Sequence, residues 1–505
     1  MKNTKITLNL LYSIVNTIIL GLVNLAYPLI IGFIYDPTLV GNFSFFNSWA
    51  IILSIPIVNG IAPSLSRFIA ANSDNNEKTM ENMGILFSTI YILSIIIIFP
   101  ITNIFTTNFS WQELLLVLGL LLSSIFHYLF RHSEQGKEKF KSILILEAIS
   151  FILIIPLVIV FFINSGTRDF IIQGRYYLLA LPMLIYHFIF NLIFILIKNK
   201  RNDFNQFFKL SKNKSKRMLF YAGYVFISNV FVLGLSQVQI IISKNMLTGT
   251  EVGVLGFWNS AIAPLALLTV SITSLLIPRL TNLQLNKEHM TEYFVNKFNW
   301  GLSLIIIPFF GTLFLFISAY PNWIDAIVPA EYQTMYYWPI IILLAVKEVN
   351  NLLWSPTMSY LSTSERYIHY IAIISFFYAI CVIIPWIFLV PKLGIFGLVA
   401  GIAIGSFLTN FLFQLIGFVI YKRKIGLHTL YILITTALWY LFFYFLKWSK
   451  IGITIIWLVI NIPFFVYGII TLIKLFKISK YSFRYGSEID NIKEVDYLTP
   501  ETESQ

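Results

Sequence analysis

The sequence has very little charge and almost no cysteine for its length. Of its 505 residues only 11% are Asp, Glu, Lys or Arg, whereas a soluble globular protein carries about 25%. The single cysteine, Cys381, falls inside an apolar run, which excludes disulfides and thiolate metal sites. There is also no Walker sequence, no metal-binding His/Cys/Asp spacing and no nucleophile elbow. The low charge, together with the apolar composition described next, excludes a soluble enzyme and a nucleic-acid binder, and no motif supports catalysis.

Apolar residues make up most of the chain instead. They account for 58% of the sequence, and the mean hydropathy is +0.79. Because a spanning helix needs about 20 apolar residues, this composition predicts an all-α polytopic membrane protein with 14 transmembrane helices. The predicted spans are 6–34, 42–67, 83–105, 112–130, 142–163, 176–197, 218–243, 252–278, 294–318, 336–361, 368–390, 395–420, 429–446 and 451–475.

The placement of positive charge predicts the orientation of these spans. With fourteen spans, 28 of the 35 Lys and Arg residues fall on the side of the termini, six fall on the opposite side, and Lys347 falls within a span. Cytoplasmic loops are enriched in Lys and Arg, so both termini are predicted to be cytoplasmic, in the cytoplasmic membrane. The apolar run 6–34 is longer than a secretory signal core and is interpreted as an uncleaved first span.

A sequence repeat divides the chain into two similar units. VGNFSFFNS at 40–48 matches VGVLGFWNS at 252–260 in five of nine positions, and the same offset of 212 places Arg67 on Arg279. Six helices per unit is an even number, so both units enter the membrane in the same direction and form two parallel six-helix lobes. The predicted organisation is 1–197 (first lobe), 198–217 (basic cytoplasmic linker), 218–420 (second lobe), 421–475 (two C-terminal helices) and 476–505 (cytoplasmic tail).

These features resemble a known transporter family. The segments that carry the resemblance are VGNFSFFNS and GIAPSLSRFIA (60–70), together with the helix plan and the basic linker. They are similar to the polysaccharide-transporter branch of the multidrug/oligosaccharidyl-lipid/polysaccharide exporter superfamily, the Wzx-type repeat-unit flippases. The resemblance implies transfer of undecaprenyl-diphosphate-linked oligosaccharide to the outer leaflet by alternating access. The partners that it implies are this lipid-linked glycan, membrane lipids and a polysaccharide polymerase, with no nucleic acid.

Lys347 and Glu348 are the most specific candidate site. Both fall near the middle of span 336–361, where a charge costs about 2.5–3.5 kcal/mol. Helical spacing puts Asn351 and Trp354 on the same broad arc, which offers an ammonium to a diphosphate, an amide to sugar hydroxyls and an aromatic face to a sugar ring. The alternative is a structural charge patch. Glu348 is a candidate for coupling to H⁺ or Na⁺, with neutralisation of Lys347 as the alternative; no other cofactor is expected.

Further substrate-binding candidates lie on the repeated helices. Arg67 and Arg279 end equivalent spans on the cytoplasmic side, where a guanidinium suits a phosphate but also serves as a positive-inside anchor. Asn47 and Asn259, equivalent in the repeat, either line the transport path or join helices at about 0.6 kcal/mol each.

Three titratable residues within spans receive less weight. His127 and His187 are interpreted as packing residues. Glu147 is a second acidic candidate for ion coupling, but its position near a cytoplasmic helix end also allows it to reach water.

Three other functions compete with this one. A peptidoglycan-precursor flippase also has fourteen helices, whereas a cation-coupled drug exporter of the same superfamily usually has twelve. A membrane-embedded glycosyltransferase or polymerase needs a sizeable outer loop, and the longest here, 319–335, offers only Asp325 and Glu331. The sequence therefore predicts a transporter and not an enzyme.

Overall fold

The computed structural model consists of helices throughout the part of the chain that it describes. That part comprises residues 12–13, 15–23, 27–71, 77–106, 109–198, 212–286, 288–319, 326, 328–332, 337–364, 366–421 and 450–484. The elements are α2 (Tyr27–Ile34), α3 (Pro37–Ile55), the π-helical turn η2 (Pro56–Ile61), α4 (Ala62–Ala71), α5 (Glu77–Thr106), α6 (Trp111–Gly136), α7 (Phe140–Ile163), α8 (Ser165–Ile172), the 3₁₀ turn η3 (Tyr176–Ala180), α9 (Leu181–Lys198), α10 (Lys212–Asn229), the π-helical turn η6 (Val230–Gly234), α11 (Leu235–Met246), α12 (Gly249–Asn286), α13 (Glu288–Ala319), the 3₁₀ turn η7 (Ala330–Tyr332), α15 (Tyr337–Thr363), α16 (Ile368–Leu393), α17 (Ile395–Tyr421) and α19 (Lys450–Arg484).

The predicted all-α polytopic membrane fold is confirmed. Among the described residues, eight helices are long and apolar enough to cross a membrane, and α10 with α11, bent by 40° at η6, is a ninth candidate. The count of fourteen stays a prediction, because span 429–446 and the start of span 6–34 lie outside the described residues. The lobe boundaries also stay predictions. Most of the linker 198–217 and the end of the tail are not described, and α19 continues past 475 to Arg484.

The second predicted span is one long helix with an irregular turn. It begins at Pro37, five residues before the predicted start, because the Asp36 side chain accepts a hydrogen bond from the Leu39 backbone N–H over 2.8 Å and caps the helix. Pro56 lacks a backbone N–H, and the π-helical turn η2 begins at this residue. The helix then continues as α4, which contains Arg67 and ends at Ala71.

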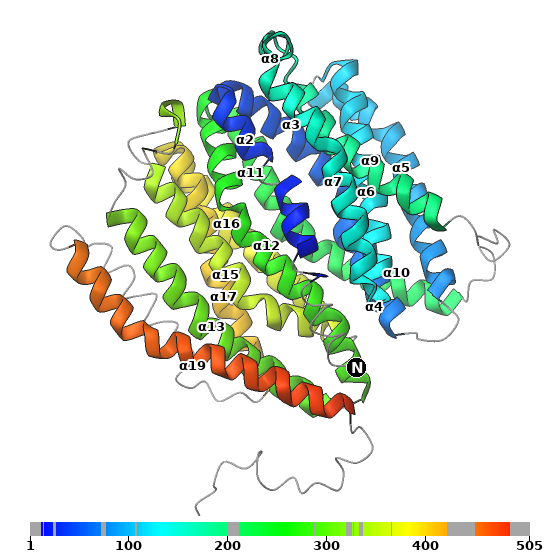
Figure 1. Ribbon diagram of the computed structural model, residues 1–505, viewed down its shortest axis with the longest axis vertical. Coiled ribbons are helices and arrows are strands. Elements are labelled where there is room, and N and C mark those ends of the chain that lie inside the picture. Colours follow the sequence, from blue (N-terminus) through cyan, green and yellow to red (C-terminus); the bar gives the residue numbers. More distant parts are fainter. Residues whose placement is uncertain are drawn as a thin grey trace, which may run out of the picture.

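Two groups of helices lie beside each other (Figure 1). In the first, α6 packs against α3, α4, α5, α7 and α9; in the second, α15 packs against α12, α13, α16 and α17. These groups are called the N-terminal and C-terminal halves below. They meet where α3 packs against α11 and α12, and where α4 and η2 pack against α10. Helix α19, orange in Figure 1, lies along α13.

Large apolar side chains cover the outside of the bundle. Ile97 of α5 is 65% exposed, Leu196 of α9 67% and Phe388 of α16 66%. A soluble protein rarely exposes apolar surface of this extent, whereas a lipid bilayer accommodates it. The exposed apolar faces therefore agree with the membrane location that the hydropathy predicts.

Candidate functional site

The repeated motif places two glycines where α3 and α12 cross. A Cβ added to Gly41 would lie 2.6 Å from the carbonyl oxygen of Gly249, and one added to Gly253 would lie 1.7 Å from the carbonyl oxygen of Pro37. The offset of 212 relates these two contacts, because Gly41 corresponds to Gly253 and Pro37 to Gly249. Only glycine allows two helix backbones to approach so closely. The motif therefore marks a contact between the halves, at what is called the Pro37 end of the bundle (residues 35–37, 247–249 and 332).

Other contacts join the halves at the Pro37 end. The Tyr332 hydroxyl donates to the backbone carbonyl of Tyr35 over 3.0 Å, and its ring stacks on Phe257 of α12 with 4.3 Å between ring centroids. Lys244 of α11 donates to Asn42 Oδ1 of α3. Burial raises the pKa of Tyr332 above its ordinary value, so its hydroxyl stays a donor at physiological pH.

Arg67 joins the halves at the opposite end, called the Arg67 end (residues 67–71, 133–139 and 362–364). Its Nη2 donates over 2.9 Å to the carbonyl oxygen of Thr363, the last residue of α15. The guanidinium carbon lies 4.4 Å from the ring centroid of Tyr221 on α10, and the Tyr221 hydroxyl donates to the Ser362 carbonyl. A cation is favoured at the carbonyl end of a helix. Arg67 therefore ties α4 to α10 and α15, with only 8% of its surface exposed.

Lys347, Glu348 and Asn351 form one polar group in the middle of α15. Lys347 Nζ lies 2.8 Å from Glu348 Oε1, and Asn351 Nδ2 donates to Glu348 Oε2 over 3.2 Å. The Lys347 and Glu348 side chains are 11% and 10% exposed. Pairing lowers the cost of both charges in the membrane. An ammonium has three N–H donors, so this pair is compatible with an anion beside Lys347 as well as with a purely structural role.

Trp354 lies in the core of the C-terminal half. It is 2% exposed, and its ring packs against Tyr378 of α16 and Phe413 of α17, with 6.1 and 5.1 Å between centroids. In this conformation the indole faces neighbouring helices, so a sugar would reach it only after α15 moves relative to α16 and α17.

The other predicted site residues belong to helices other than α15. Asn47 of α3 and Asn259 of α12 follow the two crossing glycines by six residues, and Asn47 Oδ1 is buried without a hydrogen-bond partner among the described residues. Arg279 belongs to α12, but its side chain lies outside the described part. Sixteen residues separate Lys347 from Thr363, the partner of Arg67, which is about 24 Å along a helix. The structure therefore places Arg67 and Lys347 at different depths.

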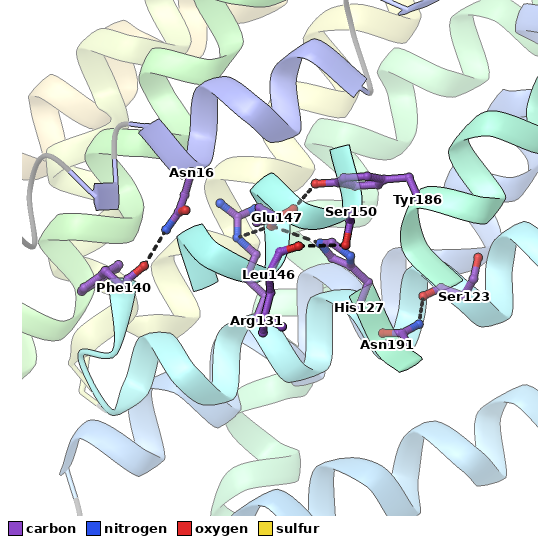
Figure 2. Close-up of polar contacts among 10 residues, drawn as sticks. All are labelled: Asn16, Ser123, His127, Arg131, Phe140, Leu146, Glu147, Ser150, Tyr186 and Asn191. Atoms are coloured by element: carbon purple, nitrogen blue, oxygen red, sulfur yellow. Dashed lines mark hydrogen bonds and ion pairs between the residues drawn. The ribbon is translucent and has the colours of Figure 1, made fainter. Parts of the chain in front are cut away.

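A second charged group is buried among α6, α7 and α9, and is called the Glu147 cluster (His127, Arg131, Glu147 and Tyr186; Figure 2). Glu147 Oε1 lies 3.3 Å from His127 Nε2 and 3.7 Å from Arg131 Nε, and the Tyr186 hydroxyl donates to Glu147 Oε2. The side chains of Glu147 and His127 are fully buried and that of Arg131 is 4% exposed. One carboxylate oxygen therefore faces two basic side chains away from water.

Sequence reasoning underestimated this cluster. It allowed Glu147 to reach water, and its charge count places Arg131 in a loop, but α6 continues to Gly136 and so contains Arg131. A usable signal was present, because His127 and Arg131 are four residues apart and share a helix face. Along the sequence, His127 and Glu147 are also the same number of residues away from residue 137, which lies in the connection between α6 and α7. In an antiparallel helix pair such residues lie at the same depth.

Metal binding has little support in the described part of the chain. Within it, no group of three or more His, Cys, Asp or Glu side chains is arranged to hold a metal ion. The charged groups found here suit anion binding, ion pairing and proton exchange instead.

Comparison with known proteins agrees with this architecture. The model of a protein family described as "Polysaccharide biosynthesis protein" matches residues 5–284. No curated protein matches the sequence. Among solved structures, the chain is similar to a MATE protein in the bent conformation, with 14% identity, a TM-score of 0.60 and coverage of 83% of this chain and 95% of that chain.

The chain is also similar to two further solved structures with the same fold. One is an outward-facing multidrug resistance MATE family transporter of the MOP superfamily, with 15% identity, a TM-score of 0.56 and coverage of 83% of this chain and 95% of that chain. The other is a Vibrio cholerae MATE transporter in the bent form, with 15% identity, a TM-score of 0.56 and coverage of 83% and 97%. The helices of this chain are therefore arranged as in MATE transporters.

Proposed function

Because the chain belongs to the polysaccharide biosynthesis protein family, we propose that it is a flippase for lipid-linked repeat units. It would move undecaprenyl-diphosphate-linked oligosaccharide from the inner to the outer leaflet of the cytoplasmic membrane by alternating access, for surface polysaccharide synthesis. The observation that carries this proposal is the family match over residues 5–284 on a chain with a transporter fold. A polysaccharide assembled on a lipid carrier needs such a transporter, since its polar glycan does not cross the hydrocarbon region unaided.

The charged residues support a diphosphate as the recognised group. Lys347 offers an ammonium within a membrane span, and Arg67 offers a guanidinium that matches phosphate geometry. Arg67 now bonds the Thr363 carbonyl. In the proposed cycle, opening of the Arg67 end releases the guanidinium from this carbonyl and allows a phosphate to take its place.

The contacts at the two ends support alternation. The halves are joined at the Pro37 end through Gly41 and Gly253 and at the Arg67 end through Arg67 and Thr363. Alternating access requires one set to separate while the other holds. We assign the Arg67 end to the cytoplasmic side, because the basic loops gather there.

The alternatives differ in what they bind. A peptidoglycan-precursor flippase also carries a lipid diphosphate, and the same cationic groups suit it. A drug exporter of the same fold is favoured by the structural similarity alone.

Glu348, the earlier candidate for ion coupling, already contacts Lys347 and Asn351. This geometry favours the alternative role, in which Glu348 neutralises Lys347.

Deletion of the gene in its own organism tests the proposed function. The deletion strain should lose surface polysaccharide and accumulate lipid-linked repeat units. Wild-type protein and the control Lys392→Ala, at an exposed position near the end of α16, should restore export, whereas Lys347→Ala should not. A change in drug susceptibility with normal surface polysaccharide would support the drug exporter instead.

A further inference from the structure

The Glu147 cluster places two basic side chains against one carboxylate oxygen. Glu147 and Arg131 neutralise each other across 3.7 Å. His127 faces the same carboxylate oxygen at 3.3 Å and is the side-chain type whose charge changes near neutral pH. Neither His127 nitrogen has a hydrogen-bond partner of good geometry among the described residues. The cluster therefore contains a buried base next to a buried carboxylate.

We propose that His127 and Glu147 form a proton-binding site within the membrane, and that its protonation is coupled to the transport cycle. A proton from water adds to His127 Nε2, and the resulting imidazolium faces Glu147 Oε1. Release returns the proton to water, and no other bond changes. The binding of the proton stands on the geometry alone, whereas its coupling to transport rests on the proposed function.

The geometry favours a proton over a metal cation. A sodium ion needs several oxygen ligands, and the cluster supplies one carboxylate that already contacts Arg131 and Tyr186. A cation at Oε1 would also lie beside the Arg131 guanidinium, which repels it. A proton needs no set of oxygen ligands, because it binds to an imidazole nitrogen; its positive charge is spread over the ring and is still repelled by Arg131.

The titratable groups around His127 come from three helices. From α6 they are Tyr128, Arg131 and His132, from α7 Glu147, and from α9 Tyr186 and His187. The His187 ring centroid lies 4.7 Å from that of His127. Within this set Glu147 is the one carboxyl group, so it is the group whose negative charge stabilises an imidazolium at His127, against the repulsion of Arg131.

Ionisable side chains continue from the cluster toward the Arg67 end. Beyond Arg131, α6 carries Glu134, and Lys137 directly follows the last residue of α6. The charged atoms of Glu134 and Lys137 are 3.7 Å apart. Lys137 also pairs with Glu81 of α5, and the Glu81 side chain is 17% exposed. In this proposal Glu134, Lys137 and Glu81, which reaches solvent, are the route of the proton between the buried site and water.

The cluster is also connected to the first predicted span. Asn16 Nδ2 donates over 3.1 Å to the carbonyl of Phe140, the first residue of α7 (Figure 2). Phe140 precedes Glu147 by seven residues, about 10 Å along the helix. If protonation changes the attraction between α6 and α7 and α7 moves, the hydrogen bond between Phe140 and Asn16 connects this movement to the first predicted span.

Nitrogen-15 NMR of histidine-labelled protein tests proton binding directly. The full chain, which has six histidines, is placed in phospholipid nanodiscs and titrated from about pH 4 to pH 9. The His127 signal, identified by its loss in His127→Gln, should change from charged to neutral within this range. Glu147→Gln should lower its midpoint by at least about one pH unit, a tenfold loss of proton affinity. The control His369→Gln, in α16, should leave the His127 titration unchanged.

Two further variants distinguish the loss of this proton site from a general loss of folding. Glu147→Asp keeps the charge and should retain the titration. Tyr186→Phe removes the hydrogen bond to the other carboxylate oxygen but keeps the carboxylate beside His127, and should also retain the titration. A His127 signal that stays neutral throughout the titration, or a midpoint that Glu147→Gln leaves unchanged in folded protein, overturns the site.

Coupling is tested separately in proteoliposomes with a fluorescent undecaprenyl-diphosphate oligosaccharide. A pH gradient should accelerate flipping by wild-type protein, and His127→Gln should remove this acceleration. Gradient-independent flipping by the wild type overturns coupling but not proton binding. Absence of any flipping, with a normal His127 titration, overturns the proposed function and not the site.

Discussion

Charged side chains inside this membrane protein occur in compensated groups. Lys347 pairs with Glu348 on α15, and Arg131 and His127 face Glu147 between α6 and α7. The helices α6 and α15 occupy matching places, the fourth predicted span of each unit, and each contacts at least four other helices of its half. Compensation explains how these residues persist in the membrane. It also makes single substitutions hard to interpret, since each leaves a charge unpaired.

A charge-matched double variant separates structure from substrate binding at Lys347. Lys347→Met and Glu348→Gln alone should each destabilise the protein by about 3 kcal/mol, because each leaves one charge nearly buried and unpaired. The double variant should recover most of this stability in thermal unfolding. If Lys347 binds the diphosphate, export stays lost in the double variant. Recovery of both stability and export would show that the pair is only structural.

Arg67 is expected to hold the Arg67 end closed. Arg67→Met removes the bond to Thr363 and the stacking on Tyr221, and a hydrogen bond to a charged group contributes about 1.5 kcal/mol or more. A cysteine at Ser362, which is 7% exposed, should therefore react with a maleimide about tenfold faster in the Arg67→Met chain. Cys381→Ser provides the cysteine-free background.

The control for this measurement is a cysteine at Ser406, a fully buried residue of α17. Its labelling rate should not respond to Arg67→Met. An equal increase at both positions would indicate general loosening of the protein, and no increase at Ser362 would contradict the assignment of Arg67 to this contact.

At the scale of helices, the crossing of α3 and α12 depends on two glycines. Gly253→Ala would put a methyl group 1.7 Å from the Pro37 carbonyl oxygen, so the helices must separate at the Pro37 end. We expect export to fall about tenfold or more, since about 1.4 kcal/mol corresponds to a factor of ten. Gly223→Ala in α10 is the matched control, because a Cβ there meets no atom within 4 Å. Its export should equal that of the wild type, with a slight gain in helix stability. Equal export by both variants contradicts a functional crossing.

The sequence predicted these helices well and the buried contacts less well. Long apolar runs and charge placement predict the spans, because lipid imposes a simple rule on each segment. The repeated motif contains Gly41 and Gly253, but only the structure shows that these two glycines face each other. The Glu147 cluster depends on three helices meeting, which no single segment encodes. The inward packing of Trp354 depends in the same way on α16 and α17.

At the scale of the whole molecule, the orientation in the membrane is a prediction from the charge distribution. In the Cys381→Ser background, a cysteine at Thr248, an exposed residue of the Pro37 end, should react with a membrane-impermeant maleimide in intact cells. A cysteine at Glu138, exposed at the Arg67 end, should react only after the membrane is opened. The reverse pattern would show that the chain is inserted with its termini outside.

Flipping of a lipid-linked oligosaccharide by the purified protein tests the central claim most directly. A fluorescent undecaprenyl-diphosphate oligosaccharide is placed in both leaflets of proteoliposomes, and dithionite is added to reduce the dye on the outside. Wild-type protein should make nearly all of the dye accessible, whereas protein-free vesicles and the Lys347→Met/Glu348→Gln double variant should leave about half protected. Protection of half the dye by correctly folded wild-type protein, with or without a pH gradient, would contradict the assignment of this chain as a lipid-linked oligosaccharide flippase.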